Sequence, residues 1–282
     1  MKKIILSMFC IFLLVGCSTK QENITIKKNN NQETVDLKVG FGLHHIEDGY
    51  SFDGKDVDIN YDYEVVGRDA NFGLMIFING IPQMIKHEDK ESLVYTFKGK
   101  KDTNKTEHVS IIPNTGSKGD HLYMHAFLIA DYEIVDSLKQ LTNKQHMMAC
   151  GTTFIDIHQD TANNPIDLNN NYDLIDYTSD LLKHDDEEGY FDNNLLIQFP
   201  NNLEGNFKKN KPITIKMSGI SDNYILWVLE DLKPVSSYHI ELPKNKSAVL
   251  SYKPKNKTKN VKAIAIPLSS NLPEESTSLV VK

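Results

Sequence analysis

Hydrophobic and polar residues alternate along much of the chain, a pattern that indicates half-buried β-strands. From residue 57 to residue 65 every odd position is apolar and every even position is polar, and a similar alternation runs from Val35 to Leu43. Leu74 to Ile78 is continuously apolar and ends at Asn79-Gly80, which predicts a central strand closed by a turn. We expect further strands at 92–98, 107–113, 121–131, 153–158, 194–199, 212–218, 224–230, 237–242, 247–253 and 260–267.

Helical spacing of apolar residues is found in only two stretches. The first runs from Asp136 to Met148, with Leu138 and Leu141 on one face, and is expected at a domain junction. The second runs from Tyr172 to His184. The expected fold class is therefore mainly all-β, with one or two short helices.

The two halves of the chain show a weak repeat. When Gly67 is aligned with Gly219 without gaps, Leu74 matches Leu226, Met75 matches Trp227 and Pro82 matches Pro234. We interpret this as two tandem copies of one β-module. The alternative is that any two β-sandwiches share apolar strands and prolines.

These modules resemble the immunoglobulin-like domains of bacterial surface proteins. The resemblance implies two tandem antiparallel β-sandwiches, with Trp227 in a central strand and held between the sheets of its own module. The cysteine pair that joins the sheets of antibody domains is absent, which excludes the antibody type. The resemblance carries no catalytic residue over to this chain.

The amino terminus has the features of a secretory signal. Lys2 and Lys3 precede the apolar run from Ile4 to Val15, which is shorter than the roughly 20 residues that span a membrane. The run ends in Leu14-Val15-Gly16-Cys17, which resembles the lipobox of bacterial lipoproteins. That resemblance implies cleavage between Gly16 and Cys17 and acylation of the Cys17 thiol with a diacylglyceryl group. The alternative is an ordinary signal peptide with a chance cysteine.

The expected organisation places five segments along the chain. They are a lipoprotein signal peptide (1–16), a polar membrane-proximal tether (17–32), a first β-sandwich module (33–135), a junction that contains the first expected helix (136–150) and a second β-sandwich module (151–282).

Charge and cysteine content exclude some classes of partner and cross-link. The net charge is −7, and becomes −9 without Lys2 and Lys3, while Arg68 is the only arginine, so no nucleic acid partner is expected. If Cys10 leaves with the signal and Cys17 is acylated, Cys150 has no partner for a disulfide. We interpret Cys150 as a small buried apolar residue; the alternative is a reactive thiol.

Two acidic clusters are weak candidates for a Ca²⁺ site, and no other cofactor is expected. The first is Asp56, Asp58, Asp62 and Glu64 on one face of a strand, where neighbouring carboxylates are too far apart to share an ion without a nearby loop. The second is Asp185, Asp186 and Glu188, which does not match EF-hand spacing. For both, a solvated acidic surface is the simpler interpretation. The histidines lack zinc-site spacing, since His121 and His125 share a strand face but are about 13 Å apart.

These features predict a bacterial cell-surface protein, anchored by lipid on the extracytoplasmic face of a membrane. Its expected role is non-enzymatic: binding, accessory or protective against a toxin, with a surface protein, peptide or glycan as partner. A cell-envelope hydrolase is the first alternative. A transporter's solute receptor is the second, and it is disfavoured because such receptors need two α/β lobes and a hinge.

Overall fold

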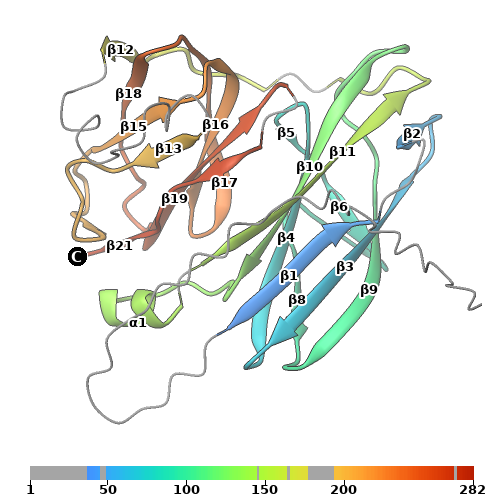
Figure 1. The fold of residues 1–282 in the computed structure, drawn as a ribbon, viewed down its shortest axis with the longest axis horizontal. Coiled ribbons are helices and arrows are strands. Elements are labelled where there is room, and N and C mark those ends of the chain that lie inside the picture. Colours follow the sequence, from blue (N-terminus) through green and yellow to red (C-terminus); the bar gives the residue numbers. More distant parts are fainter. Residues whose placement is uncertain (1–36, 45–48, 145, 164–165, 177–193, 270–271) are drawn as a thin grey trace, which may run out of the picture. The chain divides into compact units, whose positions relative to one another are not determined.

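The computed structural model describes residues 37–44, 49–144, 146–163, 166–176, 194–269 and 272–282. The chain divides into Met1–Thr34 and Val35–Lys282, and all the described residues belong to the second, compact unit. Nearly all the regular structure in this described part is β-strand (Figure 1), with one short helix. The expected all-β fold with antiparallel sheets is confirmed.

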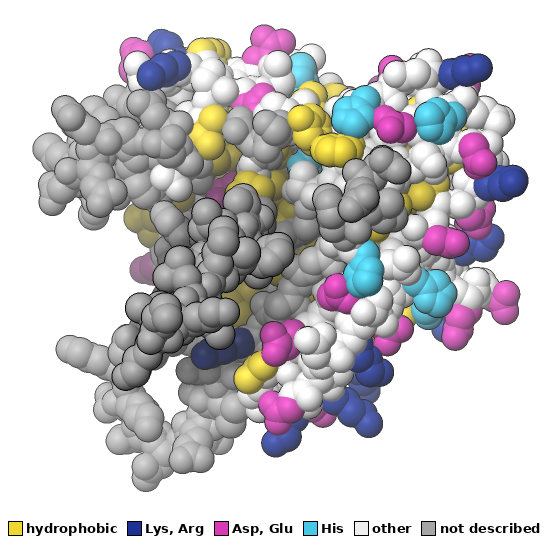
Figure 2. All heavy atoms as spheres, turned by 45° about the vertical axis from the view of Figure 1, so that its right-hand side comes forward, with side chains coloured by type: hydrophobic (Ala, Val, Ile, Leu, Met, Phe, Trp, Pro, Cys, Tyr) yellow, Lys and Arg dark blue, Asp and Glu magenta, His cyan; other side chains and the backbone are white. Residues whose placement is uncertain are grey.

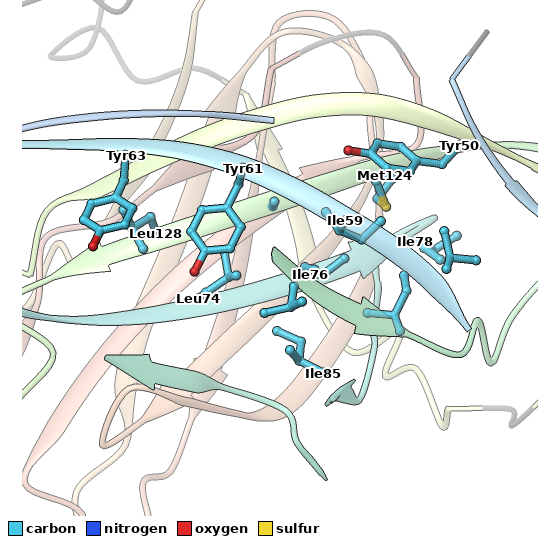
Figure 3. Close-up of a cluster of buried hydrophobic side chains, with 14 of the residues drawn as sticks. Tyr50, Ile59, Tyr61, Tyr63, Leu74, Ile76, Ile78, Ile85, Met124 and Leu128 are labelled. Atoms are coloured by element: carbon cyan, nitrogen blue, oxygen red, sulfur yellow. The ribbon is translucent and has the colours of Figure 1, made fainter. Parts of the chain in front are cut away.

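The first β-sandwich packs two sheets around one apolar core. Figure 3 shows Ile59, Tyr61 and Tyr63 projecting from β3 toward Leu74 and Ile76 of β4. One sheet has the order β1 (Lys38–Leu43), β3 (Val57–Val66), β9 (Thr103–Ile111), β6 (Ile85–His87) and β7 (Lys90–Ser92). The other has the order β2 (Tyr50–Phe52), β11 (Met148–Ile157), β10 (His121–Ala130), β4 (Ala70–Ile78) and β5 (Ile81–Pro82), with β8 (Tyr95–Gly99) also paired to β4.

The second β-sandwich has its own apolar core between two further sheets. One sheet has the order β12 (Asp173–Asp176), β18 (Lys246–Tyr252), β15 (Ile213–Gly219) and β13 (Leu195–Gln198). The other has the order β14 (Asn206–Phe207), β21 (Leu279–Val281), β19 (Asn260–Pro267), β16 (Asp222–Glu230) and β17 (Lys233–Leu242), with β20 (Glu274–Glu275) paired to β19.

One sheet of each sandwich has the same order of strands. In each of these sheets, a short early strand pairs in parallel with the last strand of its sandwich, β2 with β11 and β14 with β21. In each, the longest apolar strand pairs antiparallel with a later one, β4 with β10 and β16 with β19. The ungapped alignment of Gly67 with Gly219 superposes Ala70 on Asp222 and Ile78 on Glu230, the first and last residues of β4 and β16. The weak sequence repeat therefore corresponds to a repeated strand order.

A third apolar cluster joins the inner sheets of the two sandwiches and explains why β4, β10, β16 and β19 are buried on both faces. Trp227 belongs to this cluster, since Leu226 and Val228 fill the core of the second sandwich and alternation turns Trp227 the other way. Its indole N–H donates to the carbonyl of Gly80 at 2.8 Å. The expectation that Trp227 lies between the sheets of its own module is wrong.

The first sandwich extends beyond the expected boundary at residue 150. The strand β11, which contains residue 151, pairs with β10 over nine residue pairs and so belongs to the first sandwich. The segment 136–150 is therefore mostly the connection within one hairpin. It does contain a helix, α1 (Leu138–Asn143), whose N-cap is Ser137, but none of the helical residues is buried.

The second expected helix is wrong where the structure describes it. Asp173–Asp176 is the edge strand β12, paired with β18. Pairing with Lys246 to Val249 satisfies the backbone hydrogen-bonding groups of this segment. This pairing outweighs the weak helical spacing of its apolar residues. Residues 177–184 of that expected helix lie outside the described residues.

Candidate functional site

The first acidic cluster forms an exposed strand face, as its alternation predicts. Asp58 and Glu64 are exposed on β3. Asp56, just before β3, forms an ion pair with Lys86 at 2.9 Å. Asp62 accepts a hydrogen bond from the Thr106 hydroxyl at 2.5 Å and contacts His44 at 3.0 Å. Within the described ranges, no three metal-ligating side chains gather in one place.

The other residues singled out in the sequence either lie outside the described part of the chain or have no metal-binding arrangement in it. Gly16, Cys17, Asp185, Asp186 and Glu188 lie outside the described residues. His121 and His125 share a strand face as expected, but His121 is exposed and His125 is fully buried. Cys150 is half-buried and packs against the apolar cluster between the sandwiches.

A hollow of about 350 Å³ opens between the β16–β17 turn and the loop that joins β18 to β19. Lys233, Lys255 and Lys257 lie around it, and Ile134 and Val235 supply apolar surface. We call this group of five residues and its floor, Glu230, the lysine hollow. Ile134 reaches it from the first sandwich, so loops of both sandwiches build it.

Two carboxylates hold the lysine-bearing loop in place. Glu230 is 6% exposed and accepts hydrogen bonds from the Tyr252 hydroxyl (2.6 Å), the Lys255 amide (2.9 Å) and the Thr258 hydroxyl (2.7 Å). Burial and this carboxylate together raise the pKa of Tyr252, so its hydroxyl stays protonated and donates. Asp231 accepts from the amides that follow Thr258. The loop is therefore fixed by two hydroxyls and three backbone amides, and the side chains of Lys255 and Lys257 take no part in these bonds.

The turn under the hollow has an unusual backbone. Asp231 and Leu232 both have positive φ angles, 50° and 65°, as a two-residue hairpin of type I′ requires. Aspartate tolerates this conformation, whereas leucine rarely adopts it. Leu232 is 2% exposed, and its carbonyl accepts from the Tyr132 hydroxyl at 3.4 Å. Burial of the leucine side chain offsets the backbone strain and fixes the turn against the first sandwich.

The rim of the hollow is positively charged. Lys233, Lys255 and Lys257 are exposed, and none of them forms an ion pair with a carboxylate among the residues that the structure describes. Lys259, in contrast, is paired with Asp136 at 2.7 Å. Sequence reasoning missed this site, although Lys253-Pro-Lys-Asn-Lys-Thr-Lys259 places a lysine at every second position. The loop turns at residues 256–257, and only Lys255 and Lys257 of these four lysines line the hollow, so spacing along the sequence does not identify the site.

The arrangement can bind an anionic group next to an apolar one. The lysines supply point charges for an anionic group, and Ile134 and Val235, 52% and 37% exposed, supply apolar contacts beside it. Among the residues that the structure describes, no histidine or cysteine lines the hollow. Its buried hydroxyl, that of Thr258, donates to Glu230, where it serves to fix the loop.

Comparisons with known proteins identify similar structures but no family. No family model and no curated protein matches the chain. Similar solved structures include the periplasmic chaperone SfaE, at 10% identity and a TM-score of 0.20, covering 87% of this chain and 100% of that one. Another is the Salmonella enterica SafA pilin in complex with the SafB chaperone, at 9% identity and a TM-score of 0.27, covering 85% and 96%. These values are too low to transfer a function. Among the described residues, no helix has the length and apolarity to cross a membrane.

Proposed function

We propose that the protein is a lipid-anchored, extracytoplasmic binding protein that holds an acidic segment of a protein or peptide partner in the lysine hollow. The observation that carries this proposal is the group of three exposed lysines without carboxylate partners around exposed apolar side chains. An acidic segment with one apolar residue complements both features. The proposed role is accessory: the lysines bind charge and the apolar side chains bind a neighbouring apolar residue.

The lipid anchor is supported by the sequence at the amino terminus. The lipobox Leu14-Val15-Gly16-Cys17 gives one thiol for acylation, and two acyl chains hold a protein at a membrane where a single chain binds reversibly. The polar segment 17–32 then serves as a tether. In this arrangement the folded unit stays at the membrane surface, where it meets other surface proteins.

The structure also bears on the solute-receptor alternative. Such receptors close two lobes around a ligand by a hinge motion. Here a continuous apolar cluster of ten buried residues joins the inner sheets of the two sandwiches. Opening it would expose that surface to water at a cost that grows with the area. This contact therefore disfavours a hinged receptor.

A photo-crosslinking experiment in living cells tests the partner. A photoreactive amino acid at Val235, in the full-length lipidated protein, is expected to form an adduct with a protein chain. The same residue at Leu203, which is 84% exposed and lies outside the hollow, is expected to form none. The double substitution Lys255→Glu, Lys257→Glu should abolish the Val235 adduct because it reverses the charge of the rim.

The matched control is Lys100→Glu, Lys101→Glu, which makes the same charge change at two exposed lysines outside the hollow and should leave the adduct intact. Absence of an adduct, together with turnover of an envelope polymer, would support the hydrolase alternative instead.

The anchor is tested separately by mass spectrometry of the mature amino-terminal peptide, with Cys17→Ser as control. A bare mature terminus would remove the lipid from the proposal and leave the hollow as it stands.

A further inference from the structure

A second exposed site lies on the outward face of β10 and β11. Three cross-strand pairs follow one another there: His121 with Asp156, Tyr123 with Phe154, and His125 with Thr152. Paired residues are lateral neighbours, and residues two apart on a strand face the same side. Five of the six side chains therefore form one surface, which we call the aromatic strip, while the sixth, His125, is fully buried at its end.

The strip faces away from the core of the first sandwich. Met124, Ala126 and Leu128 point into that core, so alternation turns the residues between them outward. Further along β10, Phe127 and Ile129 are covered by the second sandwich. The strip itself stays accessible, since Phe154 is 41% exposed and the side chains of His121 and Asp156 are 56% and 40% exposed. Figure 2 shows histidine and acidic side chains next to one another at more than one place on the visible face of the molecule.

Phe154 is the aromatic centre of the strip. Its ring centroid lies 4.6 Å from that of His121 and 6.4 Å from that of Tyr123. Gly49 holds it from the side: a Cβ added to Gly49 would lie 3.1 Å from the ring, and its φ of +70° suits glycine. A partly exposed phenylalanine packed among polar neighbours offers an apolar surface for contact with a ligand.

The ends of the strip supply hydrogen-bonding groups. His121 Nδ1 contacts Asp156 Oδ1 at 2.6 Å, so in the neutral imidazole Nδ1 carries the proton and Nε2 is an acceptor. The described residues provide no hydrogen-bond partner for Asp156 Oδ2. At the other end the Thr152 side chain is exposed. Next to it, both ring nitrogens of the buried His125 have no hydrogen-bond partner.

We propose that the aromatic strip binds a neutral glycan that contains N-acetylhexosamine. A sugar ring has an apolar C–H face, which stacks on Phe154, and its edge carries hydroxyl and amide groups, which match Asp156 and His121. No lysine or arginine belongs to the strip, so an anionic ligand gains nothing there. A purely apolar ligand would leave the polar ends without partners. The three pairs span about 13 Å along the strand, room for more than one sugar ring.

This site is separate from the lysine hollow and does not depend on the proposed protein partner. The test uses isothermal titration calorimetry of the purified full-length protein in detergent with chitotetraose, a soluble β-1,4-linked N-acetylglucosamine tetramer. We expect saturable binding. Phe154→Ala and Asp156→Asn should each weaken it by roughly tenfold, the loss of one stacking or charged hydrogen-bond contact.

Two further variants keep the result interpretable. Phe154→Tyr retains a ring of the same shape and should retain binding, which separates loss of the ring from loss of folding. Lys255→Glu, Lys257→Glu should bind chitotetraose as the wild type does, because it changes only the lysine hollow. The proposal is overturned if wild-type protein does not bind chitotetraose, or if it binds equally well after Phe154→Ala and Asp156→Asn.

Discussion

The contact between the two sandwiches has two regions that are built in different ways. The first, the apolar contact, buries side chains of β4, β10, β16 and β19 without charge. The second, the polar margin, lies where the 131–147 connection meets β19 and the segment before β21. Its members are Val135, His146, Asn260, Lys262, Glu275 and Ser278.

The polar margin is held by directional bonds. The Asn260 side chain accepts from the Val135 amide at 2.8 Å and donates to the Val135 carbonyl at 2.9 Å. Lys262, 2% exposed, donates to the Ser276 carbonyl at 2.8 Å. Its ammonium also lies 2.6 Å from Glu275 Oε2, close enough for an ion pair although that oxygen lacks hydrogen-bond alignment.

The two regions contribute differently to the contact between the sandwiches. Apolar burial stabilises the contact in proportion to area and tolerates small shifts. Paired hydrogen bonds such as those between Asn260 and Val135 form at one geometry only. We infer that the apolar contact holds the sandwiches together and that the polar margin fixes their relative position.

The largest effect is expected from Trp227→Ala in the apolar contact. Trp227 is 5% exposed, and its loss should lower the free energy of unfolding by about 4 kcal/mol through a cavity and one lost hydrogen bond. Urea denaturation measures this. Trp227→Phe, which keeps a ring and loses the bond to Gly80, should cost less, and Leu203→Ala, at an 84% exposed position, should cost almost nothing. Equal losses for Trp227→Ala and Leu203→Ala would contradict the importance of the apolar contact.

A smaller effect is expected at the polar margin from Glu275→Ala. This change leaves the buried Lys262 ammonium without its carboxylate, and we expect a loss of about 2 kcal/mol. The loss stays below that for a fully buried pair, because the Glu275 side chain is 28% exposed and Lys262 keeps the Ser276 carbonyl. The same urea denaturation should show that Lys262→Met costs less, since it removes the buried charge itself. A greater loss for Lys262→Met would show that the ion pair stabilises the fold.

The strands could be predicted from the sequence because burial on one face of a strand makes apolar and polar residues alternate along it. Alternation located β3 closely, and the continuous run from Leu74 to Ile78 identified a strand covered on both faces. The pattern does not say what covers the second face. For Trp227 that cover is the other sandwich, and only the packing of two remote segments shows it. The boundary at residue 150 failed for a similar reason, since β11 pairs backward with β10 across a loop that resembles a junction.

The candidate site was less predictable than the fold. The sequence suggested a Ca²⁺ site in the acidic clusters along β3 and at 185–188. In the structure, Asp56 and Asp62 instead have partners within the protein, Lys86 and Thr106. The lysine hollow depends on Glu230, which fixes the loop. The sequence does not reveal this role, because the three groups that donate to Glu230 come from residues 252–258. The aromatic strip depends on the register of β10 against β11, which no local pattern fixes.

The smallest effect distinguishes two buried histidines, one on the strand face that continues into the apolar contact and one in the polar margin. His125 shares a strand face with Phe127 and has no hydrogen bond, whereas His146 contacts the Glu133 carbonyl and the Ser278 hydroxyl. Burial lowers the pKa of both to about 4, below the usual 6.5 of an unfolded chain. Between these values the unfolded chain takes up protons that the folded chain does not, so stability falls as the pH falls from 6.5 toward 4.

Each histidine should therefore cost about 1 kcal/mol of stability at pH 5.5 relative to neutral pH, measured by urea denaturation at both values. His125→Phe should remove its share of this pH dependence and leave stability at pH 7 unchanged or higher, because no hydrogen bond is lost and two unsatisfied nitrogens disappear. His146→Phe should remove a similar share but lower stability at pH 7, since the Glu133 carbonyl and the Ser278 hydroxyl lose their partner. Identical behaviour of the two variants at pH 7 would mean that the hydrogen bonds of the polar margin contribute no more than apolar packing at the same place.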